Sequence, residues 1–167
     1  MPDTYSFEIV ALDDEWRPWA MELLAQEWGG PMIVTRGKVH DAGVLPGFIA
    51  LHREEPVGLA TYRIEGDECE LMSLNSLVEG RGIGAALIAS VRDVSRAAGC
   101  RRLWLITTND NLAALRFYQK RRFRLAALYP NAIALSRQYK PEIPMTGLEG
   151  IPLRDEIEVE ELLVGHD

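Results

Sequence analysis

Apolar and polar positions alternate along much of the first half of the chain, a pattern that is typical of β-strands. It predicts strands over residues 5–10, 33–35, 47–52, 57–64 and 68–77. Short turns at 53–55 and 65–67 join the last three strands into an antiparallel meander. One helix interrupts the alternation, because apolar residues recur at helical spacing from Trp16 to Glu27. The acidic residues 13–15 favour a helix start through the helix dipole, and Gly29-Gly30-Pro31 favours its end.

The second half of the chain alternates between helical and strand patterns. Apolar positions recur at helical spacing from Ile83 to Ala98, and Gly99 ends that predicted helix. The following patterns predict a strand over 103–107, a helix over 111–120, a strand over 123–128, a helix over 131–140 and a closing edge strand over 157–160. A meander followed by strand–helix units predicts an α/β fold, in which a mixed sheet carries helices on its faces.

Length and composition fit one globular domain. The chain has 167 residues, of which 47% are hydrophobic and 26% charged, and these values exclude disordered, collagen-like and coiled-coil proteins. We expect a single domain over residues 1–167, in which residues 141–167 form a tail that begins rich in Pro and Gly and contains the closing strand.

Several features bear on location and partners. No apolar run approaches the roughly 20 residues that span a bilayer, and Met1-Pro2-Asp3-Thr4 lacks the basic and apolar regions of an export signal. Cys69 and Cys100 are too few for a disulfide scaffold, so we expect reduced thiols and a cytoplasmic protein with no membrane partner. The net charge of −7 argues against a nucleic-acid partner.

The segment from Leu71 to Ile88 combines a strand, a loop with three glycines and an amphipathic helix. The first N–H groups of a helix have no intrahelical partner, and the helix dipole favours negative charge at that end. Glycines let the backbone approach a ligand closely. This junction is therefore suited to a phosphate or a diphosphate.

Several readings of this loop compete. A P-loop needs Gly-Lys-Ser/Thr, whereas Ala85-Ala86 stands here, so we reject it. A dinucleotide-binding fingerprint needs a third glycine where Leu87 stands. A plain tight turn between strand and helix and a dinucleotide-binding protein stay open as alternatives. The remaining candidate ligand is coenzyme A.

Two segments resemble the signatures of one family. Residues 79–84, Glu-Gly-Arg-Gly-Ile-Gly, resemble the Gln/Arg-x-x-Gly-x-Gly/Ala motif of the GNAT superfamily of acetyl-CoA-dependent N-acetyltransferases. Residues 109–123 resemble the family's Asn-x-x-Ala…Phe-Tyr…Gly-Phe signature. The resemblance covers roughly residues 45–129 and implies a mostly antiparallel sheet, splayed open in its middle and flanked by helices, with the cofactor in the split. Two residues depart from the motifs, since Glu79 replaces Gln/Arg and Arg122 replaces Gly.

The resemblance also implies a cofactor site for acetyl-CoA as the co-substrate. The backbone of Leu74, Asn75 and Ser76 would face the pantetheine arm and the thioester carbonyl. The loop residues Glu79, Gly80, Arg81, Gly82, Ile83 and Gly84 would hold the diphosphate. Asn111 would contact the pantetheine, although a helix N-cap is an equally natural role for it. No group of residues shows the spacing of metal ligands, so we expect no metal.

For catalysis, Tyr118 matches the tyrosine that in many family members gives a proton to the departing thiolate; the alternative is a core tyrosine. Glu68 and Glu70 are the candidate bases. Strand alternation would place them on one face with Met72 and Leu74, and the alternative is a solvated strand start.

The resemblance therefore implies an N-acetyltransferase that transfers acetyl to a primary amine by direct attack in a ternary complex. The acceptor, a small molecule or a peptide, would face Trp28, His40, Asp41 and Tyr129. The alternative is a non-catalytic acyl-CoA-binding regulatory module. Because an edge strand invites pairing, a homodimer through the C-terminal strand is a further expectation.

Overall fold

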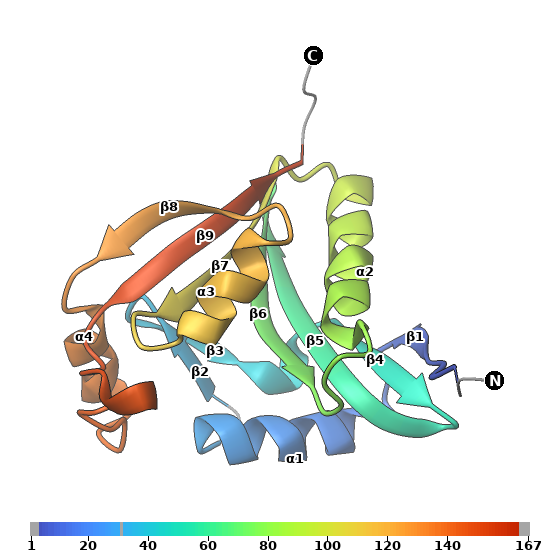
Figure 1. Ribbon diagram of the computed structural model, residues 1–167, viewed down its shortest axis with the longest axis horizontal. Coiled ribbons are helices and arrows are strands. Elements are labelled where there is room, and N and C mark those ends of the chain that lie inside the picture. Colours follow the sequence, from blue (N-terminus) through green and yellow to red (C-terminus); the bar gives the residue numbers. More distant parts are fainter. Residues whose placement is uncertain (1–3, 31, 164–167) are drawn as a thin grey trace.

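A seven-stranded sheet forms the centre of the fold in this computed structural model, which describes residues 4–30 and 32–163. Neighbouring strands are antiparallel except β6 and β7, which are parallel. The spatial order is β1 (Glu8–Ala11), β4 (Gly47–His52), β5 (Glu55–Glu65), β6 (Glu68–Ser76), β7 (Arg102–Thr108), β9 (Glu156–Leu162) and β8 (Arg124–Tyr129). Figure 1 shows this twisted sheet with helices on both faces. The predicted mixed, mostly antiparallel α/β fold is confirmed.

Four helices and a separate hairpin cover the sheet. The helices are α1 (Arg17–Trp28), α2 (Ile83–Ala97), α3 (Leu112–Gln119) and α4 (Ala132–Tyr139). Strands β2 (Met32–Thr35) and β3 (Lys38–Asp41) form the hairpin, and η1 (Ala42–Val44) and η2 (Leu148–Gly150) are short 3-10 turns. Leu87 and Val91 of α2 belong to the core cluster on one face, and Ala20 and Leu24 of α1 belong to a second cluster on the other.

Most predicted elements form within a residue or two of the expected positions, but the structure departs from the prediction at two places. Strand β3 was not predicted. The prediction of 157–160 as an edge strand is wrong, because β9 lies between β7 and β8, and β8 is the edge. The alternation misled because Glu158 and Val159 are both buried, whereas an edge strand with one solvated face exposes its polar positions.

Some expectations fall on positions outside the described residues. They concern Met1–Asp3 of the start, Pro31 of the predicted helix stop and residues 164–167 of the tail. Within the described ranges, no helix has the length and apolar character needed to cross a bilayer.

The sheet is split between β6 and β7. These strands pair only at Glu68, Cys69 and Glu70, whereas β7 pairs with β9 along its whole length, as far as Thr108. The edge of β6 that faces β7 is therefore unpaired from residue 71 to residue 76. This split is the opening in the sheet that the resemblance implies.

A bulge in β6 lies at the start of the split. Tyr62 is opposite Leu71 and Thr61 is opposite Ser73, so Met72 is an extra residue in β6. Because a bulge reverses the alternation, Leu71 and Leu74 both contact the α2 cluster while Met72 belongs to the α1 cluster. The predicted common face of Glu68, Glu70, Met72 and Leu74 therefore ends at Met72, and Leu74 turns to the opposite face.

Candidate active site

Two connected cavities follow the split from the glycine loop inward. A cavity of about 430 Å³ lies over the glycine loop, between α2 and α3. A second cavity, of about 260 Å³, lies within the split between β6 and β7. Leu74, Ala114 and Tyr118 line both, so the two cavities meet beside the hydroxyl-bearing ring of Tyr118.

The glycine loop exposes backbone N–H groups to the first cavity. Gly80 and Gly82 have φ of +73° and +78°, the left-handed region that favours glycine, and Gly82 is the N-cap of α2. No acidic residue lies in the first turn of α2, so its positive end stays available to an anion. Gly84 allows close packing, because an added Cβ would lie 3.0 Å from the Phe117 ring. Gly80, Gly82, Ile83 and Gly84 all line this cavity.

The charged residues around the loop differ in position. Glu79 lines the loop cavity, whereas Arg81 extends over the Tyr5 ring, with its guanidinium carbon 5.1 Å from the ring centroid. Arg121 lines the cavity as well. It lies 3.8 Å above the Phe117 ring and donates a hydrogen bond to the Phe117 carbonyl. Sequence analysis did not select Arg121; the basic run 120–122 next to the second motif was the available signal.

The residues of β6 that were expected to face the thioester occupy different positions. Leu74 lines both cavities, and Ser76 lines the loop cavity while its hydroxyl donates to the Val78 carbonyl. Asn75 is buried and its side-chain oxygen has no hydrogen-bond partner among the described residues. The Asn75 carbonyl lies on the β5 side, near Gly58, and Asn75 lines neither of the two cavities.

Asn111 caps α3 and also lines the split. Its side-chain oxygen accepts a hydrogen bond of 3.1 Å from the Ala114 N–H, which is the N-cap geometry that the sequence left open. The side-chain amide group forms no hydrogen bond with the described residues, so it can donate to a ligand in the split cavity.

Tyr118 belongs both to the core and to the cavity walls. Its ring packs edge-on against Phe117 and Phe123 and is 9% exposed. Burial raises the pKa of the Tyr118 phenol, so the phenol is protonated at neutral pH.

The two candidate bases lie in different surroundings. One oxygen of Glu68 accepts hydrogen bonds of 2.6 and 2.8 Å from Arg101 and Arg102, at the closed end of the split. Glu70 is 4% exposed and accepts a hydrogen bond of 3.4 Å from the Thr35 hydroxyl. Burial raises the pKa of Glu70 to about 7, against the opposing attraction of Arg63. Glu70 is thus poised to exchange a proton near neutral pH.

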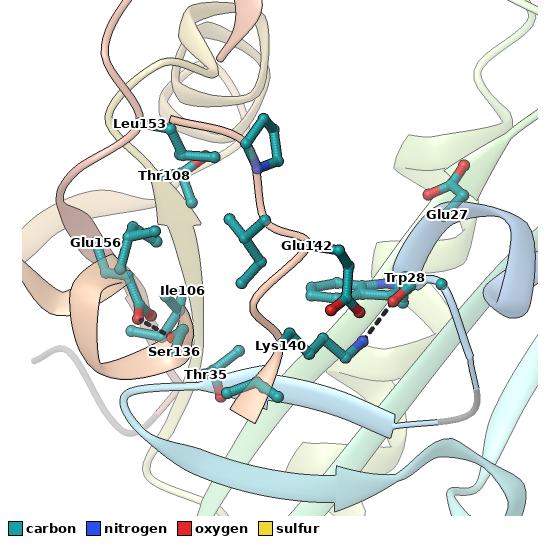
Figure 2. A pocket seen from close by; sticks show the side chains of 15 residues that line it. Glu27, Trp28, Thr35, Ile106, Thr108, Ser136, Lys140, Glu142, Leu153 and Glu156 are labelled. Atoms are coloured by element: carbon teal, nitrogen blue, oxygen red, sulfur yellow. Dashed lines mark hydrogen bonds between the residues drawn. The ribbon is translucent and has the colours of Figure 1, made fainter. Parts of the chain in front are cut away.

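A third cavity, of about 350 Å³, adjoins the split from the α1 side. It shares Trp28, Ile106 and Thr108 with the split cavity. Figure 2 shows its side chains, which come from α1, β2, β7, α4, the segment after α4 and the start of β9. This cavity is the candidate acceptor site, and Thr35, the partner of Glu70, lines it.

Of the four residues expected around the acceptor, the structure brings only Trp28 to this cavity. Asp41 instead caps η1 by accepting a hydrogen bond from the Gly43 N–H. Tyr129 donates a hydrogen bond of 3.0 Å to Glu158. His40 lies in β3, where burial lowers its pKa.

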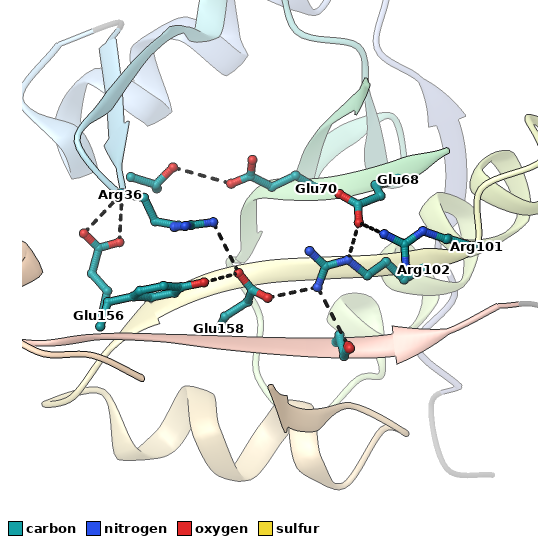
Figure 3. Close-up of polar contacts among 10 residues, drawn as sticks. Arg36, Glu68, Glu70, Arg101, Arg102, Glu156 and Glu158 are labelled. Carbon is teal, nitrogen blue, oxygen red and sulfur yellow. Dashed lines mark hydrogen bonds and ion pairs between the residues drawn. The ribbon is translucent and has the colours of Figure 1, made fainter. Parts of the chain in front are cut away.

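A network of ion pairs lies along the same face of the sheet, under the hairpin (Figure 3). Arg102 joins Glu68 of β6 to Glu158 of β9, through contacts of 2.8 and 2.9 Å. The Arg36 side chain at the hairpin tip lies 3.6 Å from Glu158, and its backbone N–H donates to Glu156. The network anchors the hairpin, which forms one wall of the acceptor cavity, to β9. In the part of the chain that the structure describes, no group of His, Cys, Asp or Glu has a geometry that could hold a metal.

Sequence comparisons identify a family and a relative. A sequence profile described as the acetyltransferase (GNAT) family matches residues 6–123. The protein YdhI of Bacillus subtilis (strain 168) is 43% identical over 137 residues, which cover 81% of this chain and 86% of YdhI.

Two solved structures share the fold. An IAA acetyltransferase from Bacillus cereus ATCC 14579 superposes with a TM-score of 0.70 at 22% identity, covering 95% of this chain and 100% of that chain. A GNAT family acetyltransferase from Elizabethkingia anophelis, solved with acetyl-CoA bound, gives a TM-score of 0.68 at 18% identity, covering 96% and 99%.

Proposed function

Because the chain belongs to the acetyltransferase (GNAT) family, we propose that it is an N-acetyltransferase, which moves acetyl from acetyl-CoA to a primary amine by direct attack in a ternary complex. One observation carries the proposal: the split between β6 and β7 joins the glycine-loop cavity to the acceptor cavity. A long anionic co-substrate and an amine therefore enter from different sides and meet at one point.

Acetyl-CoA is the proposed co-substrate. The N–H groups from Gly80 to Gly84, at the positive end of α2, suit its diphosphate, and Arg121 adds positive charge to the same cavity. The pantetheine arm would run through the split, along the unpaired edge of β6 and past the free amide of Asn111. Acetyl-CoA bound to the structural neighbour from E. anophelis supports this assignment.

Glu70 is the proposed general base, rather than Glu68, whose carboxylate is engaged by two arginines. Glu70 does not line the cavities itself, but its partner Thr35 lines the acceptor cavity. A proton leaving the amine would therefore pass to the Thr35 hydroxyl, directly or through a water, while the hydroxyl proton moves to Glu70. The neutral nitrogen then attacks the thioester carbonyl carbon, whose oxygen is stabilised by N–H groups on the free edge of β6.

Tyr118 is the proposed general acid. As the new C–N bond forms and the C–S bond breaks, the leaving thiolate takes the phenol proton. The nitrogen loses its second proton as the amide forms, and that proton restores the Tyr118 phenol through solvent. The raised pKa of Tyr118 keeps that proton in place until the thiolate appears. Burial also makes the thiolate a stronger base than it is in water, because a low dielectric disfavours its charge.

Thiol release from acetyl-CoA, measured with a panel of primary amines, tests the proposal. We expect turnover for the wild type and a loss of about 10²- to 10⁴-fold for Tyr118→Phe, the range of general acid–base contributions. Unchanged turnover of the variant would remove Tyr118 from the role of acid. Binding of CoA without turnover on any amine would favour the non-catalytic acyl-CoA module, and preferential binding of NAD would favour a dinucleotide-binding protein.

Location and assembly stay predictions. Cys69 and Cys100 are both free thiols, which supports the reducing cytoplasm as the proposed location. The homodimer was expected through the C-terminal strand, but both edges of β9 are paired. A dimer built through a sheet edge would use β8 instead.

A further inference from the structure

We propose that the acceptor carries a second cationic group on an apolar linker, and that Glu156 binds this group at the inner end of the acceptor cavity. The inference rests on the proposed function, since it names the substrate class for the same site. It goes further because it assigns a recognition role to a carboxylate that the acetyl-transfer step does not use.

Apolar side chains form most of the cavity wall. Trp28 and Ile106 line it near the split, and further apolar residues surround the rest: Val34, Ile133, Ile143, Pro144 and Leu153. A wall of this kind holds a hydrocarbon linker by excluding water from it. It gives no reason by itself to select a charged compound.

The charged groups of the wall supply that reason. Glu27, Glu142 and Glu156 line the cavity against a single cation, Lys140. Figure 2 shows Glu156 on the opposite side of the cavity from Glu27. Glu27 and Glu142 are exposed, whereas Glu156 is only 2% exposed. Of the three carboxylates, Glu156 alone has lost its contact with solvent.

Glu156 is held only by uncharged donors. Its oxygens accept hydrogen bonds from the Arg36 backbone N–H, at 3.1 and 3.3 Å, and from the Ser136 hydroxyl, at 3.4 Å. No ion pair is formed by Glu156 among the described residues. Buried carboxylates are usually paired with a cation, because burial of an isolated charge is costly. Burial raises the pKa of Glu156 accordingly.

The side chains of Arg36, whose backbone contacts Glu156, and of Lys140, which lines the cavity, have other partners. The guanidinium of Arg36 lies 3.6 Å from Glu158 and stacks over the Tyr129 ring. The Lys140 ammonium donates to the Trp28 carbonyl. The cationic partner of Glu156 would therefore come from a ligand.

The position of Glu156 fits a bifunctional acceptor. Glu156 is directly opposite Thr108 in the β7–β9 register, and Thr108 marks the passage from the acceptor cavity to the split. An amine that reaches the thioester past Thr108 and Ile106 leaves the remainder of its molecule in the acceptor cavity. A second ammonium there lies within reach of Glu156, with the linker against the apolar wall.

Calorimetric titration in the presence of CoA, which permits no turnover, tests the site. The probes are 1,5-diaminopentane, n-pentylamine and 5-aminopentanoate, which share one linker length and differ at one end. We expect the diamine to bind about ten-fold or more tightly than pentylamine, the range for a charge-assisted hydrogen bond. The aminopentanoate should bind more weakly than pentylamine, because carboxylates surround the cavity.

Variants assign the preference to one residue. Glu156→Gln keeps the acceptor oxygen for Arg36 and Ser136 and should lower the affinity for the diamine to that for pentylamine. Glu142→Gln, which removes an exposed carboxylate from the same wall, should change either affinity less than about three-fold. Glu156→Asp keeps the charge and should retain part of the preference, and it serves if the Gln variant does not fold by circular dichroism.

The results separate this inference from the proposed function. Equal affinities of the diamine and pentylamine in the wild type, or a preference that survives in folded Glu156→Gln, would overturn the cation site, whether or not amines are acetylated. A diamine preference that depends on Glu156, with no acetylation of any amine, would support the site and contradict the proposed function.

Discussion

At the scale of single residues, Glu70 and Glu68 of β6 differ in their proposed roles: Glu70 is the general base, whereas Glu68 is held by two arginines. We expect Glu70→Gln to lower kcat about 10²- to 10³-fold, because the amine then keeps its proton. Glu68→Gln is the matched control and should keep kcat within about three-fold. Steady-state kinetics with acetyl-CoA and the best amine of the panel measures both, and equal losses in the two variants would contradict the assignment.

The raised pKa of Glu70 leads to two further predictions, one for the pH dependence of the rate and one for stability. A base acts when deprotonated, so kcat/KM of the wild type should rise with pH through about 7, and Glu70→Gln should lack this limb. The same shift means that the folded state binds the proton more tightly than the unfolded chain. The contribution of Glu70 to stability is therefore greatest at or below the pKa of this carboxyl in the unfolded chain, and it falls as pH rises from about 4.5 to 7. Chemical denaturation at pH 8 should accordingly find Glu70→Gln more stable, by about 2–3 kcal/mol.

Glu79 stands where the family motif has Gln or Arg, and its carboxylate lines the loop cavity. We expect Glu79→Gln to lower KM for acetyl-CoA about two- to ten-fold by removing repulsion from the diphosphate. The gain should shrink as salt is added, because salt screens exposed charges. A KM that is unchanged at low salt would place the diphosphate away from this carboxylate.

At the scale of elements, the loop before α2 has both a structural and a binding role. Gly82→Ala forces a side chain into left-handed backbone, at a cost of about 1 kcal/mol, and should raise KM for acetyl-CoA at least five-fold. Gly66→Ala is the matched control, because Gly66 also has positive φ and open space around it but lies in the β5–β6 turn. It should lose similar thermal stability and keep KM. Parallel changes of KM in both variants would contradict a role for the loop in binding.

Local patterns were enough to predict the elements around this loop. The glycine positions and the 3.6-residue period of α2 are properties of neighbouring residues, and they predicted the segment from Leu71 to Ile88 correctly. The bulge at Met72 was not predictable in this way, because it depends on the register with β5. The buried place of β9 was missed for a similar reason: Glu158 looks solvated until Arg102 and Arg36 are brought beside it by the fold.

At the scale of the whole molecule, Arg102 links β6, β7 and β9 at the closed end of the split. We expect Arg102→Met to destabilise the protein by about 3–5 kcal/mol, since it leaves the buried Glu158 without this partner. Urea denaturation measures the change. Arg154→Met, which breaks an exposed pair with Asp155, should cost less than about 1 kcal/mol. Similar losses in both variants would show that Arg102 is an ordinary surface cation.

The acceptor cavity, also a property of the whole molecule, was the least predictable part of the site. Its wall combines residues from α1, β2, β7, α4, the segment before β9 and β9 itself, and no sequence pattern joins positions so far apart. Trp28 was the one expected acceptor residue that the fold brings to it. Glu156, Thr35 and Arg121 carried no signal strong enough to be selected.

A crystal structure with CoA bound tests the central claim most directly. We expect the diphosphate to lie on the N–H groups at the start of α2, the pantetheine between residues 71–76 and β7, and the sulfur beside the Tyr118 hydroxyl. A structure in which β6 and β7 pair along their whole length, or in which CoA lies outside the split, would contradict it.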